Sequence, residues 1–295
     1  MSKLYISNYC RISQGPERFD GIYNPTEDFR SFEPNYEEVL DIRSMRRMSP
    51  LLKMGTYTAM RSMANLSLPQ GIMAGTGLGC THDTLSFLNN LIDRKEILLN
   101  PTAFIQSTHN TLAGMLGISL KVYGYNITLS QRFESLLVCI DEILVRMTTE
   151  EMDSVLLVVG DEMSEAVTEL VTSIPDCDRN DWSEGAAAFY CTKEMTANSK
   201  FCLGNISFGP TINFENNLKE IDHVVLFQAN PFLSQKEVYR GSNAINMTQY
   251  TKYYCTADAS ALCMALDYKS SHPNDNVMFV GGGKHHSFKA QVMIC

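Results

Sequence analysis

The sequence predicts an α/β protein, because short apolar runs that end in glycine or a polar turn alternate with amphipathic helical patterns. Uninterrupted apolar runs of this length are typical of strands that are buried on both faces. The chain has 295 residues, of which 44% are hydrophobic and 19% charged, so it can bury an ordinary core. This composition excludes a largely disordered chain. We predict strands at Gly71–Gly75, Val155–Gly160, His223–Gln228 and Val277–Gly281.

The predicted helices lie between these strands and carry apolar stripes at helical spacing. The first stripe consists of Leu85, Leu88, Leu91 and Ile92. The strongest consists of Phe133, Leu136, Leu137, Ile140, Leu144 and Met147, and another of Met163, Ala166, Val167 and Leu170. The segments LLVVGDE and VMFVGGG look alike, one in each half, which suggests a duplicated α/β unit. We therefore expect one compact unit with an N-terminal half, 1–190, and a shorter C-terminal half, 191–295.

The composition also limits the partners and the compartment. With 24 basic and 33 acidic residues the formal net charge is −9, so binding to nucleic acid or to an anionic membrane is not expected. The N-terminal residues do not resemble a signal peptide, and no apolar run reaches the length of a membrane helix. The nine cysteines include no C-x-x-C pair, so no zinc ribbon or redox motif is indicated. We expect buried thiols in a reducing cytoplasm.

A glycine-rich turn follows the first predicted strand and precedes a helix. It reads Gly75-Thr76-Gly77-Leu78-Gly79, and Cys80 stands where a dinucleotide-binding fingerprint would place its third glycine. No suitably placed acidic residue follows a second strand about 20 residues further on. We interpret the segment as a tight strand-to-helix turn rather than a nucleotide site, and we expect no cofactor.

Several segments resemble, in order, parts of the β-ketoacyl synthases of the thiolase superfamily. They are Arg46–Ser49 with the following helix, the glycine-rich turn, Pro101–Gly114, Tyr123–Asn126 and Ser183–Phe189. The string PTAFIQSTHNT is similar to the ketosynthase-like branch found in aryl-polyene and flexirubin-type pigment pathways. The resemblance covers roughly residues 30–190 and is poor thereafter. It implies a thiolase-like fold with α/β/α/β/α layers and a shortened C-terminal half.

The resemblance also implies which catalytic groups are missing. A condensing ketosynthase needs a cysteine at the start of a helix, where the helix dipole and backbone N–H groups lower the thiol pKa and stabilise an oxyanion. The matching helix places Phe133 at that nucleophile position, and Cys139 lies further in, where core packing is expected. The two histidines of the family are absent from the matching segments, Phe227–Pro231 and Lys252–Ser260.

The resemblance suggests acyl-pocket candidates on several segments: His109, Gln131, Phe133, Asn230, His285 and His286. The two adjacent histidines stand in the last glycine-rich loop, Gly281–Phe288, where the usual family pattern lacks them. A basic cluster on this acidic chain suits the acidic helix and the phosphopantetheine phosphate of an acyl carrier protein. The cluster consists of Arg43, Arg46 and Arg47. A solvated helix start explains the same arginines about equally well.

The function that we predict is that of a degenerate ketosynthase relative, without the Cys-His-His machinery, that acts like a chain length factor. Such a subunit pairs with an active condensing enzyme and shapes its acyl tunnel. The expected partners are an acyl carrier protein and an active ketosynthase subunit, or a second copy in a homodimer. The pairing strand is expected around Asn126–Leu129.

Two other functions stay open at this stage. The chain can be an active acyl-thioester condensing or transfer enzyme with a relocated nucleophile, Cys255 activated by His285 or His286. It can also be a homodimeric acyl-binding module without a catalytic partner. Within the enzyme hypothesis, His109 is a further candidate for the general base. Our preferred interpretation includes no metal site, but the enzyme hypothesis offers one candidate. A candidate metal site comprises His82, Asp83 and His109.

Overall fold

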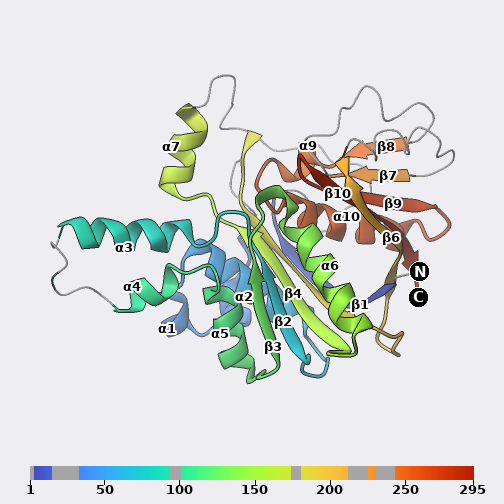
Figure 1. Ribbon diagram of the computed structural model, residues 1–295, viewed down its shortest axis with the longest axis horizontal. Coiled ribbons are helices and arrows are strands. Elements are labelled where there is room, and N and C mark those ends of the chain that lie inside the picture. Colours follow the sequence, from blue (N-terminus) through green and yellow to red (C-terminus); the bar gives the residue numbers. More distant parts are fainter. Residues whose placement is uncertain are drawn as a thin grey trace.

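The computed structural model describes residues 3–14, 33–93, 97, 101–173, 181–211, 225–229 and 243–295. Its strands form one continuous sheet in the order β3-β2-β4-β5-β1-β6-β10-β9-β7-β8 (Figure 1). The first half contributes β1 (Leu4–Ile12), β2 (Gly71–Gly75), β3 (Tyr125–Leu129), β4 (Ser154–Asp161) and β5 (Gly185–Thr192). The second half contributes β6 (Phe201–Pro210), β7 (Val225–Gln228), β8 (Asn243–Asn246), β9 (Val277–Gly282) and β10 (His286–Ile294).

The same strand pattern occurs twice in this sheet. Within each half the strands follow the order third, second, fourth, fifth, first, and the halves join through their first strands, β1 and β6. In each half the second strand is parallel to the third and the fourth, and the fifth is antiparallel to the fourth. The similar segments LLVVGDE and VMFVGGG belong to β4 and β9, which are equivalent strands of the repeat. The strand order therefore confirms the duplication that the sequence suggested.

Helices form layers on both sides of the first half of the sheet. The central helices are α6 (Ser135–Thr148) and α10 (Ala257–Ser271), and each packs against strands of both halves (Figure 1). The opposite face of the first half is covered by α2 (Pro50–Ser62) and α5 (Thr111–Leu120). The expected succession of helical and sheet layers is thus confirmed.

The remaining described elements are shorter or lie further from the centre. They are η1 (Tyr36–Glu38), α1 (Ile42–Met45), α3 (Thr81–Asp93), α4 (Pro101–Gln106), η2 (Arg132–Glu134), α7 (Glu165–Ser173) and α9 (Thr248–Thr251). In Figure 1, α3, α4 and α7 project from the left side of the molecule. Among the described helices, none is long and apolar enough to cross a membrane.

The strand predictions agree with the structure where the sheet is buried on both faces. The strand predicted at Gly71–Gly75 is β2, and the runs at Val155–Gly160 and Val277–Gly281 lie within β4 and β9. The run at His223–Gln228 includes β7, but residues 223–224 lie outside the described part of the chain. These strands were predictable because burial on both faces removes polar residues from the sequence.

The helix predictions are correct in position and partly wrong in the face that is buried. The strongest stripe is buried as expected from Leu136 to Met147, whereas its first residue, Phe133, precedes α6 and is half-buried. By contrast, α3 buries none of its residues and exposes Leu88 and Ile92. In α7 the buried residues are Val167 and Val171, and Leu170 is 65% exposed. The predicted α7 stripe is therefore wrong at Leu170, because only the i, i+4 pair Val167 and Val171 is buried in this peripheral helix.

Candidate functional site

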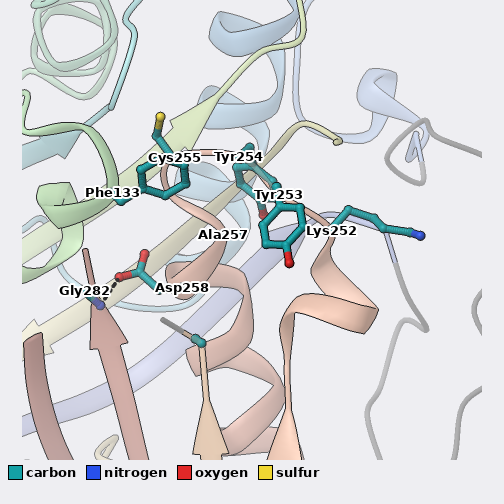
Figure 2. A pocket seen from close by; sticks show the side chains of 9 residues that line it. Phe133, Lys252, Tyr253, Tyr254, Cys255, Ala257, Asp258 and Gly282 are labelled. Carbon is teal, nitrogen blue, oxygen red and sulfur yellow. Dashed lines mark hydrogen bonds between the residues drawn. The ribbon is translucent and has the colours of Figure 1, made fainter. Parts of the chain in front are cut away.

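A small pocket lies between the segment that leads into α6 and the segment that leads into α10. Phe133, Ala229 and Gly282 line it together with residues of the segment Lys252–Asp258 (Figure 2). The free space is sufficient for about one water molecule. Side chains from both halves therefore meet at a site that is nearly filled by protein.

Phe133 is the middle residue of the turn η2, which directly precedes α6, and its side chain is half-buried. The preceding residue, Arg132, has a φ of 50°, in the left-handed region that non-glycine residues rarely adopt. Ser135 holds this turn, because its Oγ accepts a hydrogen bond from the backbone N–H of Gln131 (3.0 Å) and lies 2.9 Å from the carbonyl oxygen of Thr76. The turn thus delivers an aromatic ring into the pocket.

The glycine-rich turn after β2 is held by a buried acidic side chain. Asp161, at the end of β4, accepts hydrogen bonds at Oδ1 from the backbone N–H groups of Gly77 and Leu78, both at 2.9 Å, and from the Thr76 hydroxyl at 2.8 Å. A Cβ on Gly77 would overlap the side chain of Cys255. These contacts explain the small residues of the turn without a nucleotide, as the sequence interpretation proposed.

Glu134 connects the Phe133 turn to the last glycine-rich loop of the second half. Its Oε1 accepts hydrogen bonds from the backbone N–H groups of His285 (3.0 Å) and His286 (2.9 Å), and its Oε2 lies 3.5 Å from Nδ1 of His286. The Glu134 side chain is only 12% exposed. Sequence reasoning missed this residue, because its partners lie 151 and 152 positions further along the chain.

Cys255 is buried in the pocket wall, which matters for the relocated-nucleophile hypothesis. Burial raises the pKa of its thiol, the nearby Asp161 and Asp258 raise it further, and only Arg132 acts in the opposite direction. Among the described residues, no hydrogen bond joins this thiol to the imidazole of His285 or His286, and both histidines are exposed. The environment therefore favours the neutral thiol, which is a weak nucleophile.

Asp258 is a second buried acid that sequence reasoning did not select. Its Oδ2 accepts a hydrogen bond from the backbone N–H of Gly282 at 3.2 Å, and its carboxyl group points toward the pocket in Figure 2. Burial raises the pKa of this carboxyl well above its ordinary range. A carboxylic acid that keeps its proton in this way can donate a hydrogen bond.

The other predicted site residues are spread over a wider region. Gln131 is exposed beside the Phe133 turn, and the exposed His109 lies against Gly79 at the start of α3. Asn230 lies outside the described residues. Cys139 is fully buried within α6, in agreement with core packing. The candidate basic cluster is exposed. Arg43 belongs to α1, and Arg46 and Arg47 directly follow this helix.

The candidate metal site of the enzyme hypothesis does not assemble. Nδ1 of His82 lies 3.7 Å from a carboxylate oxygen of Asp83, at the start of α3. Within the described ranges, no group of three or more histidine, cysteine or acidic residues is arranged to hold a metal ion. The His82, Asp83 and His109 combination is therefore contradicted by the structure.

Comparison with protein-family models shows the family to which this chain belongs. The family model "Beta-ketoacyl synthase, N-terminal domain" matches residues 31–199. The structure of "The ishigamide ketosynthase/chain length factor" is similar with a TM-score of 0.78 and 11% identity, over 99% of each chain. Among curated proteins, none matches this sequence.

Two further solved structures are similar over nearly their whole length. One is the complex AntDE:AntF, a type II PKS acyl-carrier protein with its ketosynthase bound to the hexaketide. Its TM-score is 0.77 at 12% identity, and the match covers 100% of this chain and 99% of that chain. The other is the ketosynthase ApeO with its chain length factor ApeC from Xenorhabdus doucetiae. Here the TM-score is 0.62 at 14% identity, over 99% of this chain and 100% of that chain. At identities this low, the structural similarity shows that this chain shares the thiolase-like fold and nothing more specific.

Proposed function

Because the chain belongs to the β-ketoacyl synthase family, we propose that it is a chain-length-factor-like subunit that pairs with an active ketosynthase and does not condense acyl groups by itself. The observation that carries this proposal is Phe133, whose ring occupies the pocket at the turn where the resemblance expects a nucleophilic cysteine. A phenyl ring has no lone pair with which to attack a thioester. The remaining space, enough for about one water molecule, leaves no room for an acyl chain.

The neighbouring thiol does not supply a substitute nucleophile. A relocated catalytic cysteine would need a lowered pKa and a base within hydrogen-bond distance. Cys255 has a raised pKa because it is buried, and the described residues place no base in hydrogen-bond contact with its thiol. These features support a non-condensing subunit over the enzyme hypothesis.

The proposed partner subunit binds along β3. This strand is at the end of the sheet order and pairs only with β2 among the described strands, so its other edge is available for pairing. An active ketosynthase with an equivalent edge strand would extend the sheet across the two subunits. A second copy of this chain is the alternative occupant, in which case the protein is a homodimer.

An acyl carrier protein is the second proposed partner, and it would contact the basic cluster. Arg43, Arg46 and Arg47 are exposed and form no ion pair within the described chain, so their charges face solvent. The side chain of Gln106 donates a hydrogen bond to the carbonyl oxygen of Arg47 (2.8 Å), which fixes this surface against α4. The location that we propose for these encounters is the cytoplasm.

The test is the product profile of the co-purified active ketosynthase. We expect Phe133→Ala to lengthen or scatter the acyl products, because a chain can enter the space that the ring vacates. The matched control is Phe208→Ala, which removes a ring on β6 that is 36% exposed and does not line the pocket. Mass spectrometry of carrier-bound products measures both. An unchanged profile in an intact complex would reduce Phe133 to a packing residue and remove the main support for chain-length control.

A further inference from the structure

The loop that closes the pocket is attached to the Phe133 turn through one carboxylate. Glu134 receives two backbone hydrogen bonds from the loop after β9 and also lies near the imidazole of His286. Within the described chain, these contacts connect a residue of the first half to a loop of the second half, and both lie beside the pocket. Gly282, which precedes the bonded residues, itself lines the pocket.

The packing beneath the loop is built for this carboxylate. A Cβ added to Gly283 would lie 2.6 Å from Cγ of Glu134, so a larger residue would displace the side chain. Glu134 itself is nine-tenths buried, and removing its oxygens would leave the two N–H groups without their acceptor. Both elements that close the pocket, the ring of Phe133 and the backbone of the loop, therefore depend on Glu134 for their relative position.

We propose that Glu134 is a positioning residue that latches the loop Gly281–His286 onto the Phe133 turn and so keeps the pocket closed to an acyl chain. That the excluded ligand is an acyl chain rests on the proposed function. The latch itself is a property of this chain and needs no partner. When the latch is released, the wall that contains Cys255 becomes accessible to reagents from solvent.

The experiment measures alkylation of the purified protein by iodoacetamide and by N-octyl iodoacetamide, with peptide mass spectrometry to follow each cysteine. Cys255 reports opening of the pocket, and Cys139, which is fully buried in α6, reports global unfolding. For Glu134→Ala we expect labelling of Cys255 to accelerate about tenfold or more, the range set by hydrogen bonds to a charged acceptor. Labelling of Cys139 is expected to stay slow. The rate of Cys255 labelling should increase more for the octyl reagent than for iodoacetamide.

Two further variants separate a latch from ordinary packing. Glu134→Gln keeps an oxygen that accepts the two N–H groups and should label Cys255 at a rate close to that of the original protein. Glu142→Ala is the matched control on the following helix, α6, since the Glu142 carboxylate bonds Arg146 and Tyr125 and forms no described hydrogen bond with the loop. It should leave Cys255 protected.

Gly283→Ala tests the latch from the opposite side if Glu134→Ala does not fold. Its methyl group displaces the Glu134 side chain and should accelerate labelling of Cys255, whereas Gly114→Ala, where a Cβ meets nothing within 4 Å, should not. The proposal is overturned if folded Glu134→Ala and Gly283→Ala proteins label like the original, or if Glu134→Gln labels as fast as Glu134→Ala. Because no ketosynthase is present, these outcomes are independent of the product-profile test of the proposed function.

Discussion

The two halves of the molecule differ at the ends of two equivalent strands, β4 in the first half and β9 in the second. Aligning the similar segments LLVVGDE of β4 and VMFVGGG of β9 pairs Asp161 with Gly282 and Glu162 with Gly283. The side chain of Asp161 is buried within its own half, where its Oδ1 accepts three hydrogen bonds from the turn after β2. Gly283 has no side chain, and Glu134 from the first half occupies the space beside it.

This difference shows how a duplicated fold can become asymmetric at its centre. Each half needs a hydrogen-bond acceptor near the end of this strand, because the neighbouring loop presents backbone N–H groups there. In the first half Asp161 of the strand itself is the acceptor. In the second half Asp258 of α10 accepts from Gly282, and Glu134 of the first half accepts from His285 and His286 across the interface between the halves. A local acceptor holds one turn, whereas the crossing acceptor also links the two halves beside Phe133.

The largest effect on stability is expected for Asp161→Ala. The substitution leaves three donors without their acceptor in a buried turn, and each unsatisfied group costs about 1–3 kcal/mol. We expect the free energy of unfolding to fall by about 4 kcal/mol. Urea unfolding measures it, with Glu142→Ala as a control for loss of a more exposed carboxylate. A loss below that of Glu142→Ala would show that the first half does not depend on its local acceptor.

A smaller loss is expected for Phe133→Ala. A fully buried phenylalanine would cost about 3–5 kcal/mol, but this ring is half-buried, so we expect about 2 kcal/mol. Thermal unfolding of Phe133→Ala and Phe208→Ala compares two partly exposed rings. A much larger loss at Phe133 would mean that the ring is a main support of the core rather than a filler of the pocket.

The buried Asp258 is expected to make stability depend on pH. Because burial raises the pKa of its carboxyl, the folded protein keeps the proton above the pH near 4 at which the unfolded chain releases it. The folded state then binds more protons, so the free energy of unfolding falls as pH rises, by at most about 1.4 kcal/mol per pH unit for one group. Asp258→Asn should reduce this slope above a pH of about 4 in urea unfolding. An identical slope in the variant would mean that Asp258 ionises normally.

The smallest effect on stability is expected for the basic cluster, which belongs to the first half but lies away from the two strand ends compared above. Simultaneous replacement of Arg43, Arg46 and Arg47 by alanine should change the free energy of unfolding by less than about 0.5 kcal/mol per residue, because all three are exposed. Binding of an acyl carrier protein should weaken and become less dependent on salt. Calorimetric titration at two salt concentrations measures this, and unaltered affinity would exclude the cluster from docking.

The sequence predicted what depends on local pattern and missed what depends on long-range contact. The buried strands and the place of Phe133 followed from apolar runs and from the family resemblance. Glu134 and Asp258 were not selected, because an acidic residue near a helix start is ordinary and its burial depends on a loop far along the chain. The exposed position of Leu170 was missed for a related reason, since a stripe does not say how much of a peripheral helix is covered.

The most direct test of the central claim is a condensation assay on the purified chain without a partner. Carrier-bound acyl and malonyl thioesters are supplied, and mass spectrometry follows both the product and any acyl group on a cysteine peptide. The account predicts no condensation product and no acyl transfer to Cys255, because the ring of Phe133 lines the pocket where we propose that a nucleophile is missing, and burial raises the pKa of the Cys255 thiol. Steady product formation that is abolished by Cys255→Ser, or by substitution of His285 or His286, would contradict it.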